Sequence, residues 1–266
     1  MSRIPPFLKW LASSIIAIGV LTGLFVLRGE GQAAPLPAEV TAAPQPSQDV
    51  VEPAADINNL MVVLIDSQQH IVSVSILRQS EAGDKLGVVN VDPQTLIVPP
   101  GQGFVPISDA GLQGSFDGVD KAISGALGVP IDGSIYLQRL ALAGLIDGVG
   151  GVTIESNNLY RVSEIGEPPR YVRLGTSSLS GTDAAGYAMV KSKFETTDEF
   201  MARTNQVLRA VFENLQGDDA RVNEILSALG SLAKSNVPTM SIAQLLVELR
   251  ADNLWPSANI SRIPVN

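Results

Sequence analysis

An uncharged apolar run from Leu11 to Leu27 sets the first limit on how this chain can fold. Together with Phe7–Trp10 it is long enough to cross a bilayer whose hydrocarbon core is about 30 Å thick. The apolar core of a cleaved signal peptide is shorter, about 7–15 residues, and the GEGQAAP segment that follows Arg28 is a weak match to a cleavage site. The run therefore predicts a retained transmembrane helix, with a cleaved signal peptide as the alternative.

The predicted anchor divides the chain into three parts. Two basic residues precede the run and one follows it, so the slight excess on the N-terminal side places the N-terminus in the cytoplasm. Residues 29–56 are rich in Pro and Ala and poor in large apolar side chains, which is typical of an extended linker. We expect a cytoplasmic stub and anchor at 1–28, this linker, and an extracytoplasmic domain at 57–266 of a single-pass protein of the cell membrane.

Charge and composition exclude several function classes. The whole chain carries a net charge of −9, and removing the three basic residues of 1–28 leaves −12 for the remainder. Such a domain repels nucleic-acid phosphates, so we expect no nucleic-acid partner. The absence of cysteine excludes disulfides, Cys-ligated zinc and thiol nucleophiles. A single histidine, His70, makes a His-rich metal site or a Ser-His-Asp triad improbable.

The first half of the expected domain reads mainly as strands. The apolar run NLMVVLID predicts a buried strand, and HIVSVSILR and LGVVNVDP predict two more. TLIVPPGQGFVPI reads as a strand and a Pro-Gly loop. A helix is expected over 117–127 with Asp117 as its N-cap. It is followed by a strand at SIYLQ, a helix through LALAGLID and a strand at GVTIE.

The second half reads mainly as helices. One helix is expected over TDAAGYAMVKSKF, and a second over DEFMARTNQVLRAVFENLQ, where apolar residues recur on one face. VNEILSALGSLAK and SIAQLLVELR repeat the pattern, the latter with Ser241 as N-cap. Strands and helices are mixed along the chain, so we expect an α/β fold with a central mixed β-sheet covered by helices.

The stretch LIDGVGGVTIE has the composition of a phosphate-binding loop but the wrong context. Glycine-rich nucleotide loops lie between a strand and a following helix, whereas GVGG here follows a helix and precedes a strand. A P-loop would also have Lys-Ser/Thr after the glycines, and Val152 stands there instead. Gly148, Gly150 and Gly151 therefore predict a helix end and a turn with positive φ, which leaves Asp147 beside a strand start.

Several separated segments resemble the LytR-CpsA-Psr family of envelope proteins. The family pattern is a hydrophobic helix ending in Asp-x-x-Gly-Gly-Val, then Leu-x-Gly-x-x-Ala-x-x-Tyr, Arg-x-Arg and Asp-x-Gly-Arg-x-x-Arg-Gln. This chain has LALAGLIDGVGGVTI and then LSGTDAAGYAMVKSKFETTDEFMARTNQVLRAV, in the same order. The resemblance covers roughly residues 58–265 and agrees with the N-terminal anchor.

The resemblance implies an extracytoplasmic phosphotransferase domain. Family members transfer a glycopolymer from a polyprenyl-pyrophosphate carrier to peptidoglycan, and the lipid tail lies in an apolar tunnel between sheet and helices. Arginines hold the pyrophosphate, while aspartates hold Mg²⁺ or activate the acceptor. By this resemblance Asp66 and Asp147 are the expected catalytic and Mg²⁺-binding residues, and Lys191, Lys193 and Arg203 are the expected phosphate-binding residues.

The chain departs from the family pattern at the expected site. His70 or Ile71 stands where the family's second strand opens with an aspartate, and Gln94 and Thr95 replace an arginine and an aspartate. KSK replaces Arg-x-Arg, so that Lys191 and Lys193 can bind phosphate only as point charges. The final segment departs in the same way, with Phe200 in place of the first arginine, Arg203 in place of the second and Thr204 in place of glutamine.

Two functions remain open after this comparison of residues. The chain is either a membrane-anchored envelope protein that binds a polyprenyl-(pyro)phosphate lipid through a degenerate catalytic site, or an active Mg²⁺-dependent transferase with a variant site. The membrane is an expected partner for both, as is peptidoglycan or an envelope glycopolymer. Transcriptional regulation, a third reading, is disfavoured by the acidity of the domain and by the lack of a DNA-binding helix.

Overall fold

A computed structural model describes residues 56–78, 87–113, 116, 118–164, 166–251 and 261–262. The predicted anchor at 1–28, nearly all of the predicted linker at 29–56 and the predicted N-cap Asp117 lie outside these residues. Within the described part, no helix combines the length and the apolar character needed to span a membrane. The expectations about the anchor and about membrane location therefore stay predictions.

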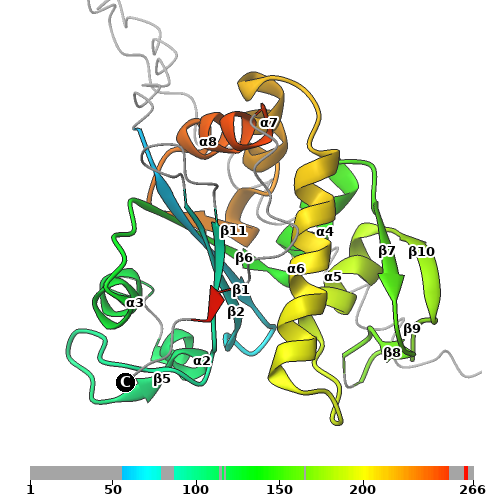
Figure 1. The fold of residues 1–266 in the computed structure, drawn as a ribbon, viewed down its shortest axis with the longest axis horizontal. Coiled ribbons are helices and arrows are strands. Elements are labelled where there is room, and N and C mark those ends of the chain that lie inside the picture. The colour runs from blue at the N-terminus through cyan, green and yellow to red at the C-terminus, as the bar shows by residue number, and fades with distance from the viewer. Residues whose placement is uncertain are drawn as a thin grey trace, which may run out of the picture. The chain divides into compact units, whose positions relative to one another are not determined.

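The fold is α/β with a central mixed sheet, as the sequence predicts. Six described strands are ordered β11-β6-β1-β2-β3-β12 (Figure 1). Pairs β1–β6 and β3–β12 are parallel, whereas β1–β2, β2–β3 and β6–β11 are antiparallel. The strand bounds are β1 Asn59–Ile65, β2 Ile71–Arg78, β3 Gly87–Val91, β6 Gly133–Gln138, β11 Ala233–Ser235 and β12 Ser261–Arg262.

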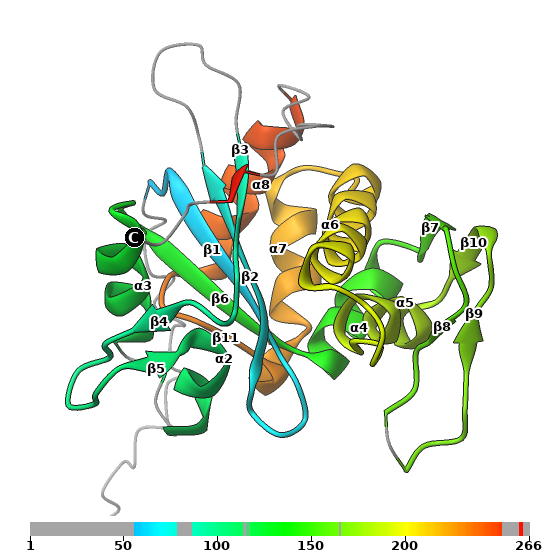
Figure 2. The ribbon, with the colours of Figure 1, turned by 60° about the horizontal axis from the view of Figure 1, so that its bottom comes forward.

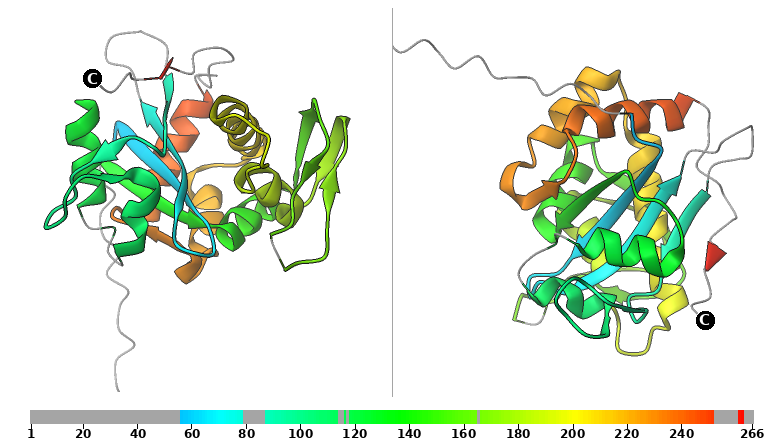
Figure 3. Two further views of the ribbon diagram at one scale, coloured as in Figure 1. Left: turned by 90° about the horizontal axis from the view of Figure 1, so that it is seen from below. Right: turned by 90° about the vertical axis from the view of Figure 1, so that its left-hand side faces the viewer.

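Helices and short strands cover both faces of this sheet (Figures 2 and 3). One face carries α2 (Ile107–Ala110), α3 (Val119–Leu127) and the β4–β5 pair (Leu96–Ile97, Val105–Pro106). The other carries α4 (Arg139–Gly148), α5 (Gly181–Met189), α6 (Thr197–Asn214), α7 (Asp219–Ser227) and α8 (Thr239–Ala251). Beyond α5 and α6 lie two small ribbons, β7–β10 (Val152–Ser156, Gly175–Leu179) and β8–β9 (Tyr160–Arg161, Tyr171–Val172).

The sheet separates two apolar clusters because successive side chains of a strand point to opposite faces. In β1, Leu60 and Leu64 belong to the cluster under α4–α8, whereas Met61 and Val63 belong to the cluster under α2 and α3. All four side chains are almost fully buried. A strand buried on both faces reads as a continuous apolar run, which explains why the NLMVVLID stretch shows no alternation.

Three helix boundaries differ from the sequence predictions. The helix expected over 182–194 ends at Met189, because Val190 is extended, so both lysines of KSK lie in the α5–α6 loop. The helix expected over 222–234 ends at Ser227, and the chain after it forms the edge strand β11. Helix α8 begins at Thr239, so the prediction of Ser241 as its N-cap is wrong.

The N-cap of α3 is Gly118, whose φ of 93° suits glycine, and not Asp117.

Helix α6 begins with a capping box formed by Thr196 and Glu199. Thr196 accepts from the backbone N–H of Glu199, and the Glu199 carboxylate accepts from the backbone N–H of Thr196. This capping box satisfies two helix-end donors and fixes where α6 leaves the α5–α6 loop.

Candidate functional site

An apolar cavity of about 70 Å³ lies between the sheet and the helices α4 and α6–α8. Its walls come from β1, β2 and β6 on one side and from four helices on the other. The lining is hydrocarbon apart from one hydroxyl, that of Ser75 on β2. Helix α6 contributes Leu208, Val211 and Phe212, and its C-cap residue Leu215 continues the same face. Because these residues recur at three- and four-residue spacing, one face of α6 forms a continuous apolar wall.

A second, polar pocket of about 250 Å³, which we call the mouth, opens at the N-terminal end of α6. It combines the start of β2, the loop after β3, helix α2, and both ends of the α5–α6 loop. Its polar side chains are those of His70, Asp92, Gln94, Ser108, Asp109, Lys191 and Thr197. Two carboxylates therefore share this pocket with a single lysine, and none of its described lining residues is an arginine.

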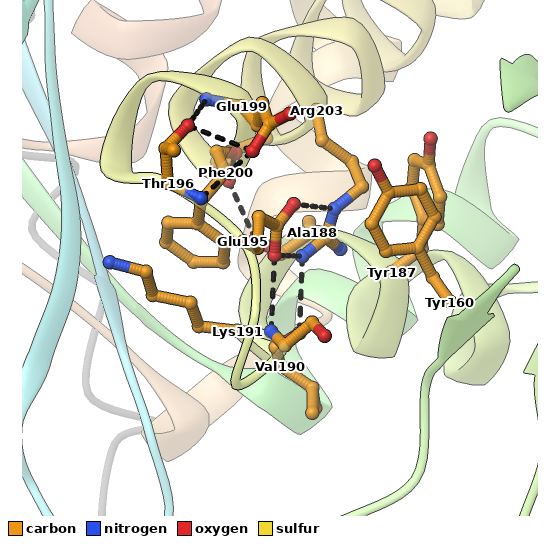
Figure 4. Close-up of polar contacts among 12 residues, drawn as sticks. Tyr160, Tyr187, Ala188, Val190, Lys191, Glu195, Thr196, Glu199, Phe200 and Arg203 are labelled. Atoms are coloured by element: carbon orange, nitrogen blue, oxygen red, sulfur yellow. Dashed lines mark hydrogen bonds and ion pairs between the residues drawn. The ribbon is translucent and has the colours of Figure 1, made fainter. Parts of the chain in front are cut away.

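Lys191 is the one expected phosphate-binding residue that lines the mouth. Its Nζ donates to Thr197 Oγ1 at 3.1 Å, and the side chain is otherwise exposed. Figure 4 shows it extending away from Arg203. Lys193 is also exposed, but its Nζ lies 5.9 Å from the centroid of the Phe194 ring and it does not line the mouth. The structure thus separates the two lysines of the KSK segment.

Arg203 is buried beneath the same loop and is paired there (Figure 4). Its Nε and Nη2 donate to the Glu195 carboxylate at 2.9 and 2.7 Å, and Nη2 also donates to the Val190 carbonyl at 3.1 Å. The two charged side chains are only 3% and 2% exposed. A bidentate pair of this kind uses the fork that would otherwise match phosphate oxygens.

Three aromatic rings surround the Arg203 guanidinium. Its central carbon lies 4.6, 4.8 and 5.3 Å from the ring centroids of Tyr160, Tyr187 and Phe200. Burial raises the pKa of both tyrosines, with the nearby Glu195 charge adding to the effect at Tyr160. Neutral rings in this arrangement favour the cation. Arg203 Nη1 is buried with no hydrogen-bond partner, so its two N–H donors are unused.

Asp66 directly follows β1 and shapes the turn to β2. Its Oδ1 accepts from the backbone N–H groups of Gln68 and His70, both at 2.8 Å, and its Oδ2 lies 3.3 Å from His70 Nδ1. Gln69 in this turn has a φ of 70°, which is uncommon for a residue other than glycine. Asp66 therefore reaches the mouth only through His70, and its metal and catalytic roles stay predictions.

Asp147 joins the end of α4 to the start of α5. Its Oδ1 accepts from the backbone N–H of Gly181 at 2.7 Å, and a Cβ at Gly181 would lie 2.0 Å from the Ala143 carbonyl oxygen. Gly150 and Gly151 have φ values of 86° and 89°, which confirms the predicted positive-φ turn for these two. Gly148 is the last residue of α4 and has no positive φ. Asp147 lines neither the cavity nor the mouth. Its catalytic and metal roles also stay predictions.

The arrangement supports binding more readily than metal-assisted chemistry. No group of three or more His, Asp or Glu residues within the described part of the chain is placed to hold a metal ion. The expected Mg²⁺ ligands Asp66 and Asp147 are each engaged with backbone N–H groups. What the described residues do offer is one accessible lysine in a polar pocket and, separately, an apolar cavity between the sheet and the helices.

Sequence reasoning missed several residues of this region. Glu195 gives no signal, because its eight-residue separation from Arg203 crosses a loop and a helix start. Asp92 and Asp109 reach the mouth through tertiary structure alone. Asn205 could have been found, since it interrupts the apolar face of α6 three residues before Leu208.

Comparison with known proteins gives a consistent picture. The sequence model of the LytR-CpsA-Psr family matches residues 101–261, more than half of the chain. No curated protein matches the chain. Among solved structures, Bacillus subtilis TagV shares 16% identity over 78% of this chain and 83% of its own, with a TM-score of 0.63.

Two further solved structures are similar. Protein gbs0355 from Streptococcus agalactiae shares 18% identity over 72% of each chain, with a TM-score of 0.63. TagT bound to LI-WTA shares 16% identity over 72% of this chain and 74% of its own, with a TM-score of 0.60. At these identities the likeness shows a common fold.

Proposed function

Because the chain belongs to the LytR-CpsA-Psr family, we propose that it is a membrane-anchored, extracytoplasmic cell-envelope protein that binds a polyprenyl-(pyro)phosphate lipid. In this proposal its function relates to a cell-wall glycopolymer, and its catalytic site is degenerate. The apolar cavity would hold part of the lipid chain and the mouth would hold the phosphate end. This proposal rests on two observations, namely that the cavity has an apolar lining and that no described lining residue of the mouth is an arginine.

The apolar part of the site supports lipid binding on energetic grounds. Each buried CH₂ group contributes about 0.8 kcal/mol to transfer from water, and this contribution needs no charged partner. The lining of the cavity is contiguous from β1 and β2 to α6 and α8. A cavity with a single hydroxyl in an otherwise hydrocarbon lining offers a water molecule too few partners, so an apolar group suits this space better.

The charged residues near the mouth support the proposal that the catalytic site is degenerate. Phosphoryl transfer relies on fixed positive charge that strengthens its contacts in the transition state. The Arg203 fork is held by Glu195, and Lys191 shares the mouth with Asp92 and Asp109. Binding energy from the lipid chain is the same in the ground and transition states, and such uniform binding does not raise the rate of the chemical step. The proposed protein therefore holds its ligand without rapid turnover.

Lipid content of the purified protein tests this function. Full-length protein is extracted from membranes in a mild detergent, purified, and analysed by lipid extraction and mass spectrometry. We expect a polyprenyl phosphate at a level approaching one molecule per chain. Polyprenyl phosphate no higher than in an unrelated single-pass protein prepared the same way would contradict the proposal.

The topology of the protein is a separate prediction. The run Leu11–Leu27 should keep the full-length chain in the membrane fraction after washing with high salt, because hydrophobic insertion is insensitive to screening. The domain should be digested by protease added outside intact cells. Recovery of a soluble form that begins near Ala33 or Ala34 would show instead that a signal peptide is removed.

A further inference from the structure

Among the described residues, the two most exposed large apolar side chains stand on two loops that border the mouth. Phe194 in the α5–α6 loop is 89% exposed, and Phe104 in the β4–β5 hairpin is 78% exposed. Single exposed apolar residues are common on protein surfaces. Two phenyl rings beside one pocket, neither of which lines that pocket or the apolar cavity, indicate a surface that meets a partner.

The β4–β5 hairpin extends from the wall of the mouth. Its base is closed by a hydrogen bond from the Ser108 backbone N–H to the Pro93 carbonyl at 2.8 Å, and both residues line the mouth. Besides Phe104, the hairpin exposes Leu96 and Val98, at 55% and 50%. No residue from Pro93 to Ser108 is charged. The hairpin is therefore an uncharged, apolar projection on a domain that is acidic as a whole.

The α5–α6 loop holds Phe194 in a fixed turn. Lys191 and Thr197 near the two ends of this loop line the mouth. Within it, the Ser192 N–H donates to the Glu195 carboxylate at 3.1 Å and the Glu195 N–H donates to the Ser192 carbonyl at 3.2 Å. The Glu195 side chain is 2% exposed. Because the turn is fixed from within the domain, Phe194 can enter a partner at little further cost in backbone entropy.

Both loops lie at the same end of the domain, which is the lower end in Figure 1 and in the right-hand view of Figure 3. We propose that this end docks on the outer leaflet of the bilayer that holds the predicted anchor, with Phe104 and Phe194 inserted at the boundary between headgroups and lipid chains. The inference rests on the proposed membrane location and adds an orientation to it, in which the mouth faces the bilayer.

A bilayer fits these loops because they combine apolar tips with a cation at the right place. The Lys193 ammonium is exposed and lies 5.9 Å from the centroid of the Phe194 ring, so it can stay among lipid phosphates while the ring lies deeper. Asp92 and Asp109 in the mouth oppose this attraction, so insertion of the apolar side chains contributes more. The predicted linker, at about 3.1 Å per residue when extended, is long enough to allow the orientation.

Nitroxide labels on the full-length protein in nanodiscs of phosphatidylcholine and phosphatidylglycerol test the docking. The chain has no cysteine, so Phe104→Cys, Phe194→Cys and Gln216→Cys each carry a single label. Gln216 is exposed and follows the opposite end of α6. Power saturation with oxygen and a nickel chelate should place the first two labels below the lipid phosphates and the third in water. A label at Phe104→Cys or Phe194→Cys as accessible to water as the third would overturn the proposal.

A second substitution tests whether the two loops insert together. In the labelled Phe104→Cys protein, Phe194→Ser should lower the ratio of inserted to water-exposed label by at least about tenfold, because one buried phenyl ring is lost. Leu174→Ser is the control, since Leu174 is 71% exposed and belongs to neither loop; it should leave the ratio unchanged. No change with Phe194→Ser, or an equal change with both, would overturn the proposal.

The polyprenyl phosphate content of the same preparations tests the proposed function separately. Bound lipid in a protein whose two loop labels are in water would overturn the docking and leave lipid binding intact. Inserted labels in a protein without bound lipid would support the docking and contradict lipid binding.

Discussion

Replacing Arg203 with leucine should lower the free energy of unfolding by about 3–5 kcal/mol, because it leaves the Glu195 carboxylate buried without its partner. The Glu195 side chain is 2% exposed and takes two hydrogen bonds from Arg203. The same change removes the cation that contacts the rings of Tyr160 and Tyr187. Urea unfolding followed by circular dichroism measures the effect.

Arg209→Leu is the matched control on the same helix. Its pair with Glu213 is 2.7 Å long, but the two side chains are 41% and 53% exposed. Exposed pairs of this kind contribute about 0–1 kcal/mol, so the control should be almost as stable as wild type. A double Glu195→Leu, Arg203→Leu variant should recover part of the loss. An Arg203→Leu protein as stable as the Arg209 control would contradict the structural role.

Mg²⁺-dependent cleavage of a polyprenyl-pyrophosphate glycan should be at least about 10³-fold slower than in a family member that keeps the arginines. Single donors to developing charge are worth about 10²–10³ in rate, and a catalytic arginine about 10³–10⁵. Here the mouth has Gln94 where the family has an arginine, and the Arg203 fork is already bonded. The measurement is product release with and without Mg²⁺, on full-length proteins in the same detergent.

Gln94→Arg places a guanidinium on a side chain that is exposed and lines the mouth. It should raise the affinity for the pyrophosphate glycan, and Gln94→Lys should raise it less, since an ammonium lacks the bidentate fork. Wild-type turnover equal to that of the intact relative, abolished by Lys191→Ala or Asp147→Ala, would instead establish a working transferase with a variant site.

The fold was predictable where a strand or helix had a regular apolar pattern and ended at a recognisable turn or cap residue. The β1 run and the apolar face of α6 were readable, because burial on one or two faces leaves a regular signature. The end of α5 was not predictable. Val190 adopts an extended conformation there, and the next helix begins only after the capping box at Thr196. β11 was missed because three residues that complete a sheet edge carry little local signal of their own.

The candidate site was predictable only in its outline. Gly150 and Gly151 form the expected positive-φ turn, and Lys191 lines the mouth while its phosphate-binding role stays a prediction. The partners of the other residues depend on tertiary structure. Glu195 reaches Arg203 across a loop, and Gly181 meets Asp147 from a different helix. No pattern of spacing encodes such contacts, so sequence alone could not separate a phosphate-binding arginine from a buried structural one.

The most direct measurement of the central claim is the affinity of the cavity for a lipid chain when the cavity is filled. Val211→Phe puts a phenyl ring on the wall of the cavity, and Ala202→Phe adds the same ring on an exposed position of α6. Binding of a polyprenyl monophosphate to full-length wild type, Val211→Phe and Ala202→Phe is compared after Tm confirms that all three are folded. The account predicts that Val211→Phe binds at least about tenfold more weakly and that Ala202→Phe equals wild type. Equal binding by all three proteins would show that the lipid does not occupy this cavity.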